Sequence, residues 1–190
     1  MSPTRWRTVD IVIAAVLGVA FGVIFWAWGL LWEGPATAIP LPGRALIYGV
    51  WLVPAVLGPL VIRKPGAGIF TELVAALVST LLGSPWGLVT VLYGVFQGAA
   101  GEFAFAATGY RQWRLPTALA GGALAGAAAT LLDLVNYYPD ASTGWKWAYG
   151  ALVVASSAVI AGAGAWALTR ALAQTGVLDR FPAGRDRAPV

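Results

Sequence analysis

The chain has 190 residues, of which 59% are hydrophobic and 11% are charged, and its mean hydropathy is +0.76. A soluble domain is about 45–50% apolar and about 25% charged, so an ordinary soluble domain and a charged disordered chain are both excluded. The absence of cysteine and histidine excludes disulfides, thiolate metal sites and histidine as a base or metal ligand. In so apolar a chain, the net charge of +4 is expected to orient a membrane protein rather than to bind nucleic acid.

Six apolar blocks follow one another along the chain. A hydrocarbon core about 30 Å thick needs roughly 20 apolar residues in a helix, which most of the blocks supply. The pattern predicts an all-α integral membrane protein, a compact bundle of six transmembrane helices in one domain over residues 1–176. A loose polar tail is expected over 177–190, and no cleaved signal peptide is expected at the start. The predicted spans are residues 11–32, 45–62, 65–82, 86–108, 115–138 and 147–169.

The basic residues are distributed unequally between the two sides of the predicted bundle. Lys and Arg are enriched in cytoplasmic loops, and ten of the twelve fall on the side of the termini. The other side holds only Arg44 and Lys146, so both termini are expected in the cytoplasm and the protein in a plasma membrane. The outer segment 33–43 contains three prolines and is either a plain connector or a flap over a site. The ten are Arg5, Arg7, Arg63, Lys64, Arg111, Arg114, Arg170, Arg180, Arg185 and Arg187.

The first span carries small residues at four-residue spacing, Ala14, Gly18 and Gly22. Such a seam permits close backbone approach between helices in a membrane. It serves either packing inside the bundle or contact with a partner membrane protein, and the sequence leaves both open.

Three predicted spans contain one carboxylate each, namely Glu72, Glu102 and Asp133, and no span contains a Lys or Arg to pair with them. A buried acidic residue costs several kcal/mol unless it is paired, hydrated or protonated, and therefore indicates a functional site. The arrangement suits a cationic or hydrogen-bond-donating ligand, a bound metal ion, or a proton path.

Polar and aromatic side chains accompany these carboxylates at helical spacing. Acceptors and amides mixed with aromatic rings suit a flat, nitrogen-rich and possibly cationic molecule, because rings stack on it or make cation–π contacts. Tyr137 shares a face with Asp133 and Asn136, and the outer tryptophans Trp28 and Trp86 are candidates for adjusting selectivity. The predicted ligand-binding residues are Glu72, Trp51, Tyr48, Gln97, Tyr93, Glu102, Asp133 and Asn136.

Five short segments carry a resemblance to a known family. In order and spacing they resemble the YkoE family, substrate-binding (S) components of energy-coupling factor (ECF) transporters linked to thiamin and its hydroxymethylpyrimidine precursor. The resemblance covers roughly residues 9–180. The segments are Tyr48–Trp51 (YGVW), Ile62–Ala67 (IRKPGA), Thr71–Leu77 (TELVAAL), Leu81–Gly87 (LLGSPWG) and Gly94–Glu102 (GVFQGAAGE).

The resemblance implies a six-helix bundle whose pocket opens outward under the outer loops. It implies a subunit that binds the vitamin without cofactor, metal or catalytic residues, and is therefore not an enzyme. A membrane-embedded coupling (T) protein and cytoplasmic ATPase subunits supply the work, which agrees with the lack of a phosphate-binding G-x-x-x-x-G-K-[ST] motif. Small residues on the first helix meet the T protein in this class, which suits Ala14, Gly18 and Gly22.

Two other functions compete with this hypothesis. One is an ion-coupled carrier or channel that uses Glu72, Glu102 and Asp133 as a relay, against which stand the short chain and the lack of an internal repeat. The other is a membrane enzyme, which would need a metal or lysine beside the carboxylates because histidine and cysteine are absent.

Overall fold

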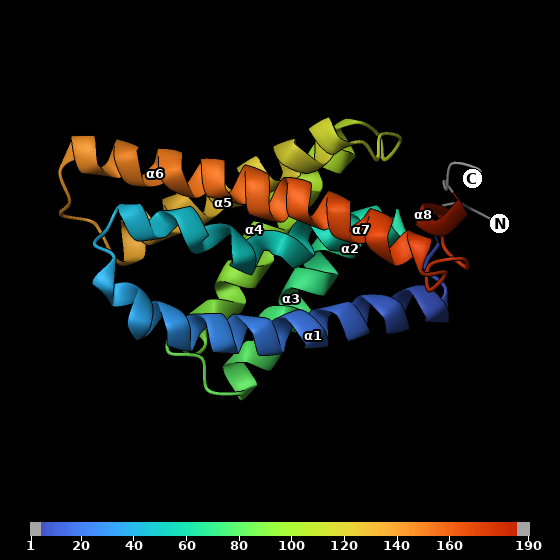
Figure 1. The fold of residues 1–190 in the computed structure, drawn as a ribbon, viewed down its shortest axis with the longest axis horizontal. Helices are drawn as coiled ribbons and strands as arrows, with labels where there is room; N and C mark the ends of the chain where they lie inside the picture. The colour runs from blue at the N-terminus through green and yellow to red at the C-terminus, as the bar shows by residue number, and fades with distance from the viewer. Residues whose placement is uncertain (1–4, 186–190) are drawn as a thin grey trace.

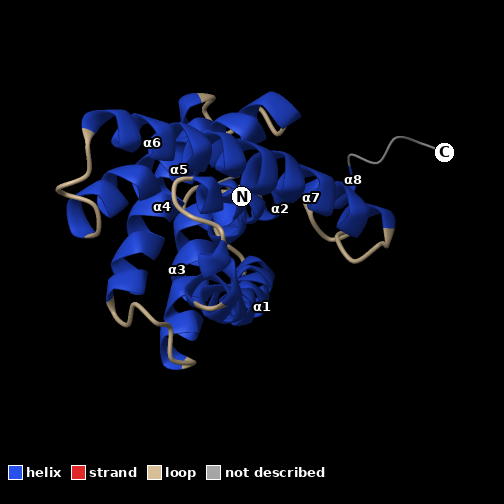
Figure 2. Cartoon of the chain, turned by 60° about the vertical axis from the view of Figure 1, so that its left-hand side comes forward, coloured by secondary structure: helices blue, strands red, loops and turns tan. Residues whose placement is uncertain are grey.

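The computed structural model describes residues 5–185, and every regular element in that range is a helix (Figure 2). The prediction of an all-α protein is confirmed. The elements are α1 (Thr8–Glu33), η1 (Pro35–Ala38), η2 (Gly43–Leu52), α2 (Val53–Ile62), α3 (Ala67–Leu81), α4 (Val89–Ala107), α5 (Leu115–Asn136), α6 (Thr143–Ser157), η3 (Ala158–Ala163), α7 (Gly164–Gln174) and α8 (Pro182–Arg185).

Five helical segments within residues 5–185 are long and apolar enough to cross a membrane. Two are composite, because η2 continues into α2 and α6 continues through η3 into α7. The predicted span 65–82 is instead the 15-residue helix α3, which at 1.5 Å per residue is only about 22 Å long. Glycines with positive φ, Gly66 and Gly83, lie just outside its two ends and stop it from extending.

The bundle has α1 on one side and the composite helix α6–η3–α7 on the other (Figure 1). Between them lies α2, in which every residue is buried. Helices α3 and α4 run obliquely across this arrangement, with α3 packed on α1 and α4 packed on both α3 and α5. Both described ends of the chain lie at the same end of the bundle.

The small-residue seam of α1 packs inside the bundle. Ala14 is fully buried, and a Cβ on Gly18 would lie 2.6 Å from the Cβ of Val74 in α3. A Cβ on Gly22 would lie 2.5 Å from that of Val78. Of the two alternatives for this seam, the structure shows packing inside the bundle, where α3 lies against it.

The second predicted span begins as the 3₁₀-helix η2. Pro54 lies at the start of α2 and has no backbone N–H to donate, so the hydrogen-bond ladder is interrupted where η2 passes into α2. Side chains three residues apart eclipse one another in a 3₁₀-helix. Ala45, Tyr48 and Trp51 consequently share the buried side of η2.

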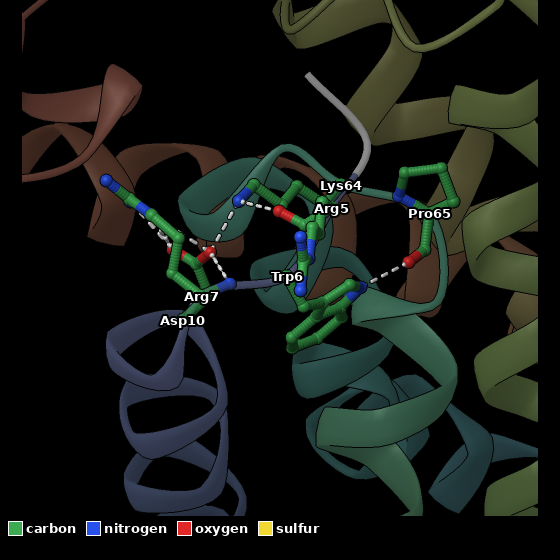
Figure 3. A network of polar contacts seen from close by, with 6 residues as sticks. All are labelled: Arg5, Trp6, Arg7, Asp10, Lys64 and Pro65. Atoms are coloured by element: carbon green, nitrogen blue, oxygen red, sulfur yellow. Dashed lines mark hydrogen bonds and ion pairs between the residues drawn. The ribbon is translucent and has the colours of Figure 1, made fainter. Parts of the chain in front are cut away.

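A polar network joins the start of α1 to the α2–α3 loop (Figure 3). The buried carboxylate of Asp10 accepts hydrogen bonds from the backbone N–H and guanidinium of Arg7 and pairs with the ammonium of Lys64 at 2.5 Å. Trp6 donates its indole N–H to the carbonyl of Pro65 at 2.9 Å. The residues before α1 are thereby held on the loop that precedes α3.

The segment after α7 is not loose over its described part. Leu178, Phe181 and Ala183 are all buried, and α8 packs against α2 and α7. Apolar residues within an otherwise polar stretch cover the end of the bundle. Residues 186–190, including Arg187 of the predicted cytoplasmic set, lie outside the described residues.

Candidate ligand-binding cavity

A cavity of about 380 Å³ lies within the bundle, near the C-terminal ends of α1 and α5 and the start of η2. This volume falls in the range of small-molecule sites, which are concave and lined by apolar and aromatic groups with a few polar ones. Residues from α1, η2, α3, α4, α5, α6 and the loops after α1, α3 and α5 line it. They are Phe25, Trp32, Glu33, Leu41, Arg44, Tyr48, Trp51, Glu72, Ala76, Ser79, Trp86, Val89, Thr90, Tyr93, Gly94, Gln97, Asp133, Tyr137, Tyr138 and Tyr149.

Glu72 contributes a carboxylate without a hydrogen-bond partner. It lies on α3, its side chain is fully buried, and neither oxygen makes a hydrogen bond of normal geometry. Gly98 of α4 lets the helices approach here, since a Cβ on Gly98 would lie 3.1 Å from that of Glu72. An unpaired buried carboxylate is costly, so a hydrogen-bond donor placed beside it would be favoured.

Asp133 is the second carboxylate of the cavity, and its oxygens are already engaged. The hydroxyl of Tyr93 donates to Oδ1 at 2.8 Å, and that of Tyr149 donates to Oδ2 at 2.7 Å. Hydrogen bonds to an ionised acceptor are strong, so Asp133 fixes two aromatic side chains from α4 and α6. It contributes negative charge and order to the cavity rather than free acceptors.

Aromatic rings form much of the remaining wall. Trp51 lies at the centre of an edge-to-face cluster, with ring centroids 5.1 Å from Trp32, 5.3 Å from Tyr48 and 5.4 Å from Trp86. Its indole N–H donates to the carbonyl of Phe25 at 3.3 Å, which ties η2 to α1. These rings present a rigid surface for a flat ligand.

Gln97 lies on α4 one turn after Tyr93, is buried, and also lines the cavity. Six of the eight predicted ligand-binding residues are therefore brought together at this cavity. They are Tyr48, Trp51, Glu72, Tyr93, Gln97 and Asp133.

Glu102 is not one of them, and its prediction as a ligand-binding residue is wrong. Its carboxylate accepts hydrogen bonds from the backbone N–H groups of Gly66, Gly68 and Ile69 at the start of α3. The hydroxyl of Tyr110 also donates to it, at 2.9 Å, and burial together with this bond raises the pKa of Tyr110 to about 12. A carboxylate stabilises the first turn of a helix, so Glu102 caps α3.

Asn136 is the other predicted residue that the structure does not bring to the cavity. It is exposed, and its side-chain amide donates to the carbonyl of Leu132 in the preceding turn. Its neighbour Tyr137, together with Tyr138, lines the cavity instead because α5 ends at Asn136 and the chain turns there.

Sequence reasoning missed Arg44 and Tyr149. The sequence marks Arg44 only as a basic residue of an outer loop. Its position at the start of the second predicted span is the one signal that it could reach a site there. Tyr149 had no signal of its own, since its partner Asp133 lies on another helix.

Comparisons with known proteins identify transport components that are similar to this chain. Residues 9–128 match the family described as the permease component of an ABC-type cobalt transport system. A Bacillus subtilis (strain 168) protein named for HMP/thiamine permease activity, YkoE, is 32% identical over 182 residues, covering 95% of this chain and 92% of that protein.

A solved structure described as an S-component of an ECF transporter superposes with a TM-score of 0.92 at 31% identity. The match covers 96% of this chain and 93% of that one. The relatives are transport components, so this multi-pass protein of the plasma membrane is not an enzyme. The chain belongs to the YkoE family of S components of ECF transporters.

Proposed function

We propose that this chain captures thiamin or its hydroxymethylpyrimidine precursor and delivers it inward as part of an ECF-type importer. The observation that carries the proposal is Glu72, a fully buried carboxylate with two unpartnered oxygens in the wall of an aromatic cavity. An aminopyrimidine supplies the N–H donors that such a carboxylate lacks. The name of the Bacillus subtilis relative, which aligns with 95% of this chain, refers to the same two compounds.

The rest of the cavity suits both rings of thiamin. The cluster around Trp51 offers faces and edges to an aromatic heterocycle, and Gln97 adds an amide with both donor and acceptor atoms. The positively charged thiazolium gains from the aromatic rings and from the charge of Asp133. Tyr48, Tyr93 and the other lining residues then fix its orientation.

Cobalt, which the matching family description mentions, suits the residues poorly as cargo. Imidazole and thiolate are favoured ligands of such metals, and this sequence has neither histidine nor cysteine. Residues 5–185 also contain no group of three or more side chains able to hold a metal ion.

An ion relay through the three carboxylates is likewise disfavoured. Glu102 is committed to the backbone of α3, and both oxygens of Asp133 are bonded to tyrosines. Only Glu72 remains without a partner among the three.

The proposed assembly has six membrane-embedded helical units, both termini in the cytoplasm and the cavity facing outward. A T protein and ATPase subunits supply the energy, as in the ECF class. Because α3 covers the Gly18 seam, we propose that the T protein packs on the opposite, exposed side of α1. A shallow apolar groove runs there along Val12, Ala15, Val16, Val19 and Ala20.

Titration of the detergent-purified protein with thiamin and, in parallel, with hydroxymethylpyrimidine tests the proposal. Saturable quenching of tryptophan fluorescence is expected, since Trp32, Trp51 and Trp86 line the cavity. Binding of the pyrimidine alone assigns the precursor as the substrate. Failure of folded protein to bind either compound contradicts the proposal, and transport by the chain alone under an ion gradient favours the carrier.

A further inference from the structure

Arg44 is the one basic side chain among the residues that line the cavity in the described part of the chain. Its guanidinium carbon lies 4.6 Å from the centroid of the Trp32 ring, and Nη1 donates to the carbonyl of Trp32 at 2.7 Å. The Nε atom is buried and has no hydrogen-bond partner. The wall therefore contains a positioned donor that the protein itself leaves unsatisfied.

Trp32 holds this guanidinium rigidly. The Trp32 ring is itself packed edge-to-face against Tyr48 and Trp51. A guanidinium that stacks on one face and donates in its own plane keeps few alternative orientations. A fixed donor of this kind discriminates between ligands that have an acceptor in reach and ligands that do not.

The cavity wall thus contains both an acceptor without a donor and a donor without an acceptor. The carboxylate of Glu72 on α3 lacks hydrogen-bond donors, whereas the Nε atom of Arg44, at the start of η2, lacks an acceptor. A ligand that satisfies both carries N–H groups at one end and an oxygen acceptor at the other.

The charges around Arg44 indicate an uncharged acceptor. Glu33 lines the same cavity, as do Glu72 and Asp133, so carboxylates outnumber the single guanidinium. A phosphate ester would place a strongly anionic group beside these three carboxyl groups, which disfavours it.

We propose that Arg44 sets specificity by donating to an uncharged hydroxyl oxygen at the end of the ligand remote from its amino group. This inference rests on the proposed function, since the ligand that Glu72 recognises must first be bound. In thiamin the hydroxyl oxygen of the hydroxyethyl group is such an acceptor.

A cycle of protein and ligand changes isolates this interaction. The probes are thiamin and its analogue in which hydrogen replaces the hydroxyl group. Wild-type protein should bind thiamin roughly 10–100-fold more tightly, the range of a hydrogen bond to a charged group. In Arg44→Met the two affinities should differ less than about twofold, because the discriminating donor is gone.

Lys146→Met is the matched control. Lys146 is the other basic residue of the predicted outer side, and its ammonium donates to the carbonyl of Pro139 away from the cavity. The ratio of the Lys146→Met variant's affinities for the two ligands should equal the ratio measured for the wild type. If Arg44→Met retains the full ratio while both affinities fall together, Arg44 acts only through Trp32 and the proposal is overturned.

A second measurement needs no variant and covers the case in which Arg44→Met does not fold. The methyl ether of thiamin keeps the acceptor oxygen but cannot donate, so wild-type protein should still prefer it to the analogue without oxygen. If the ether binds no better than that analogue, the hydroxyl acts as a donor, and the proposal fails. Failure of folded wild-type protein to bind either thiamin or hydroxymethylpyrimidine instead contradicts the proposed function, whereas thiamin binding without any preference for the hydroxyl contradicts this inference alone.

Discussion

Glu72 and Glu102 are the same residue type on neighbouring helices, both are buried, and their surroundings give them different roles. Glu102 accepts three backbone N–H groups and a tyrosine hydroxyl, so its charge is compensated by the protein. Glu72 has no such partners and faces the cavity. Charge compensation, rather than burial, separates a capping residue from a candidate binding residue.

The variant Glu72→Gln keeps the shape of the side chain but removes one acceptor oxygen and the charge. Binding of an amino-bearing ligand should weaken by about 1–3 kcal/mol. Isothermal titration of the purified variant with thiamin measures this loss. An unchanged dissociation constant removes Glu72 from the binding site.

Glu102→Gln is the control with the same chemical change outside the cavity. It should lower the melting temperature, because the start of α3 loses its carboxylate cap. Affinity of the folded protein for thiamin should stay close to that of the wild type. A loss of affinity without a loss of stability would indicate that Glu102 takes part in ligand binding.

At the scale of elements, α3 is the helix on which the cavity depends. It is short, it carries Glu72, and α1, α2 and α4 all pack against it. Its approach to α1 needs Gly18 and Gly22, because any Cβ there meets a valine of α3. A change in α1 is therefore expected to reach the ligand through α3.

Gly18→Ala should destabilise the protein by about 1–3 kcal/mol through overpacking and should also weaken thiamin binding. Thermal unfolding in detergent and a ligand titration measure the two effects. Ala15→Leu, on the exposed groove of α1, should leave both unchanged and weaken assembly with a T protein. Intact α1–α3 packing in Gly18→Ala, seen as an unchanged melting temperature, argues against this account.

The network around Asp10 is expected to hold the start of α1 to the α2–α3 loop (Figure 3). Asp10→Asn leaves the ammonium of Lys64 without its counter-charge, and breaking a buried pair in this way costs about 3 kcal/mol. Arg7→Gln changes the exposed partner of the same carboxylate and should cost less than about 1 kcal/mol. Chemical or thermal unfolding of the two variants side by side checks that Asp10→Asn loses more stability than Arg7→Gln. Equal losses of stability would contradict this prediction.

At the scale of the whole molecule, the predicted orientation in the membrane rests on the basic residues. Nine of the ten that were predicted on the cytoplasmic side fall within residues 5–185, and α1 begins at the same end of the bundle as the described C-terminal residues (Figure 1). The absence of native cysteine makes this orientation directly measurable.

Single cysteines at Thr37 and Gln112, both exposed, mark the two ends of the bundle. A membrane-impermeant maleimide added to intact cells should label Thr37→Cys and not Gln112→Cys. Permeabilised cells, in which both should react, supply the control. The reverse pattern would turn the cavity toward the cytoplasm and contradict capture from outside.

The sequence by itself determined that the chain is an all-helical membrane protein of the YkoE family, because apolar length, charge placement and motif order are local properties of a chain. It also indicated six of the cavity residues, since buried carboxylates and aromatics are conspicuous in apolar segments. Only the tertiary structure decided that Glu102 caps α3, that Asp133 is engaged by tyrosines of α4 and α6, and that Gly18 packs on Val74. Each of these depends on a partner on another helix, and which helices meet is set by packing over the whole bundle, which no single segment encodes.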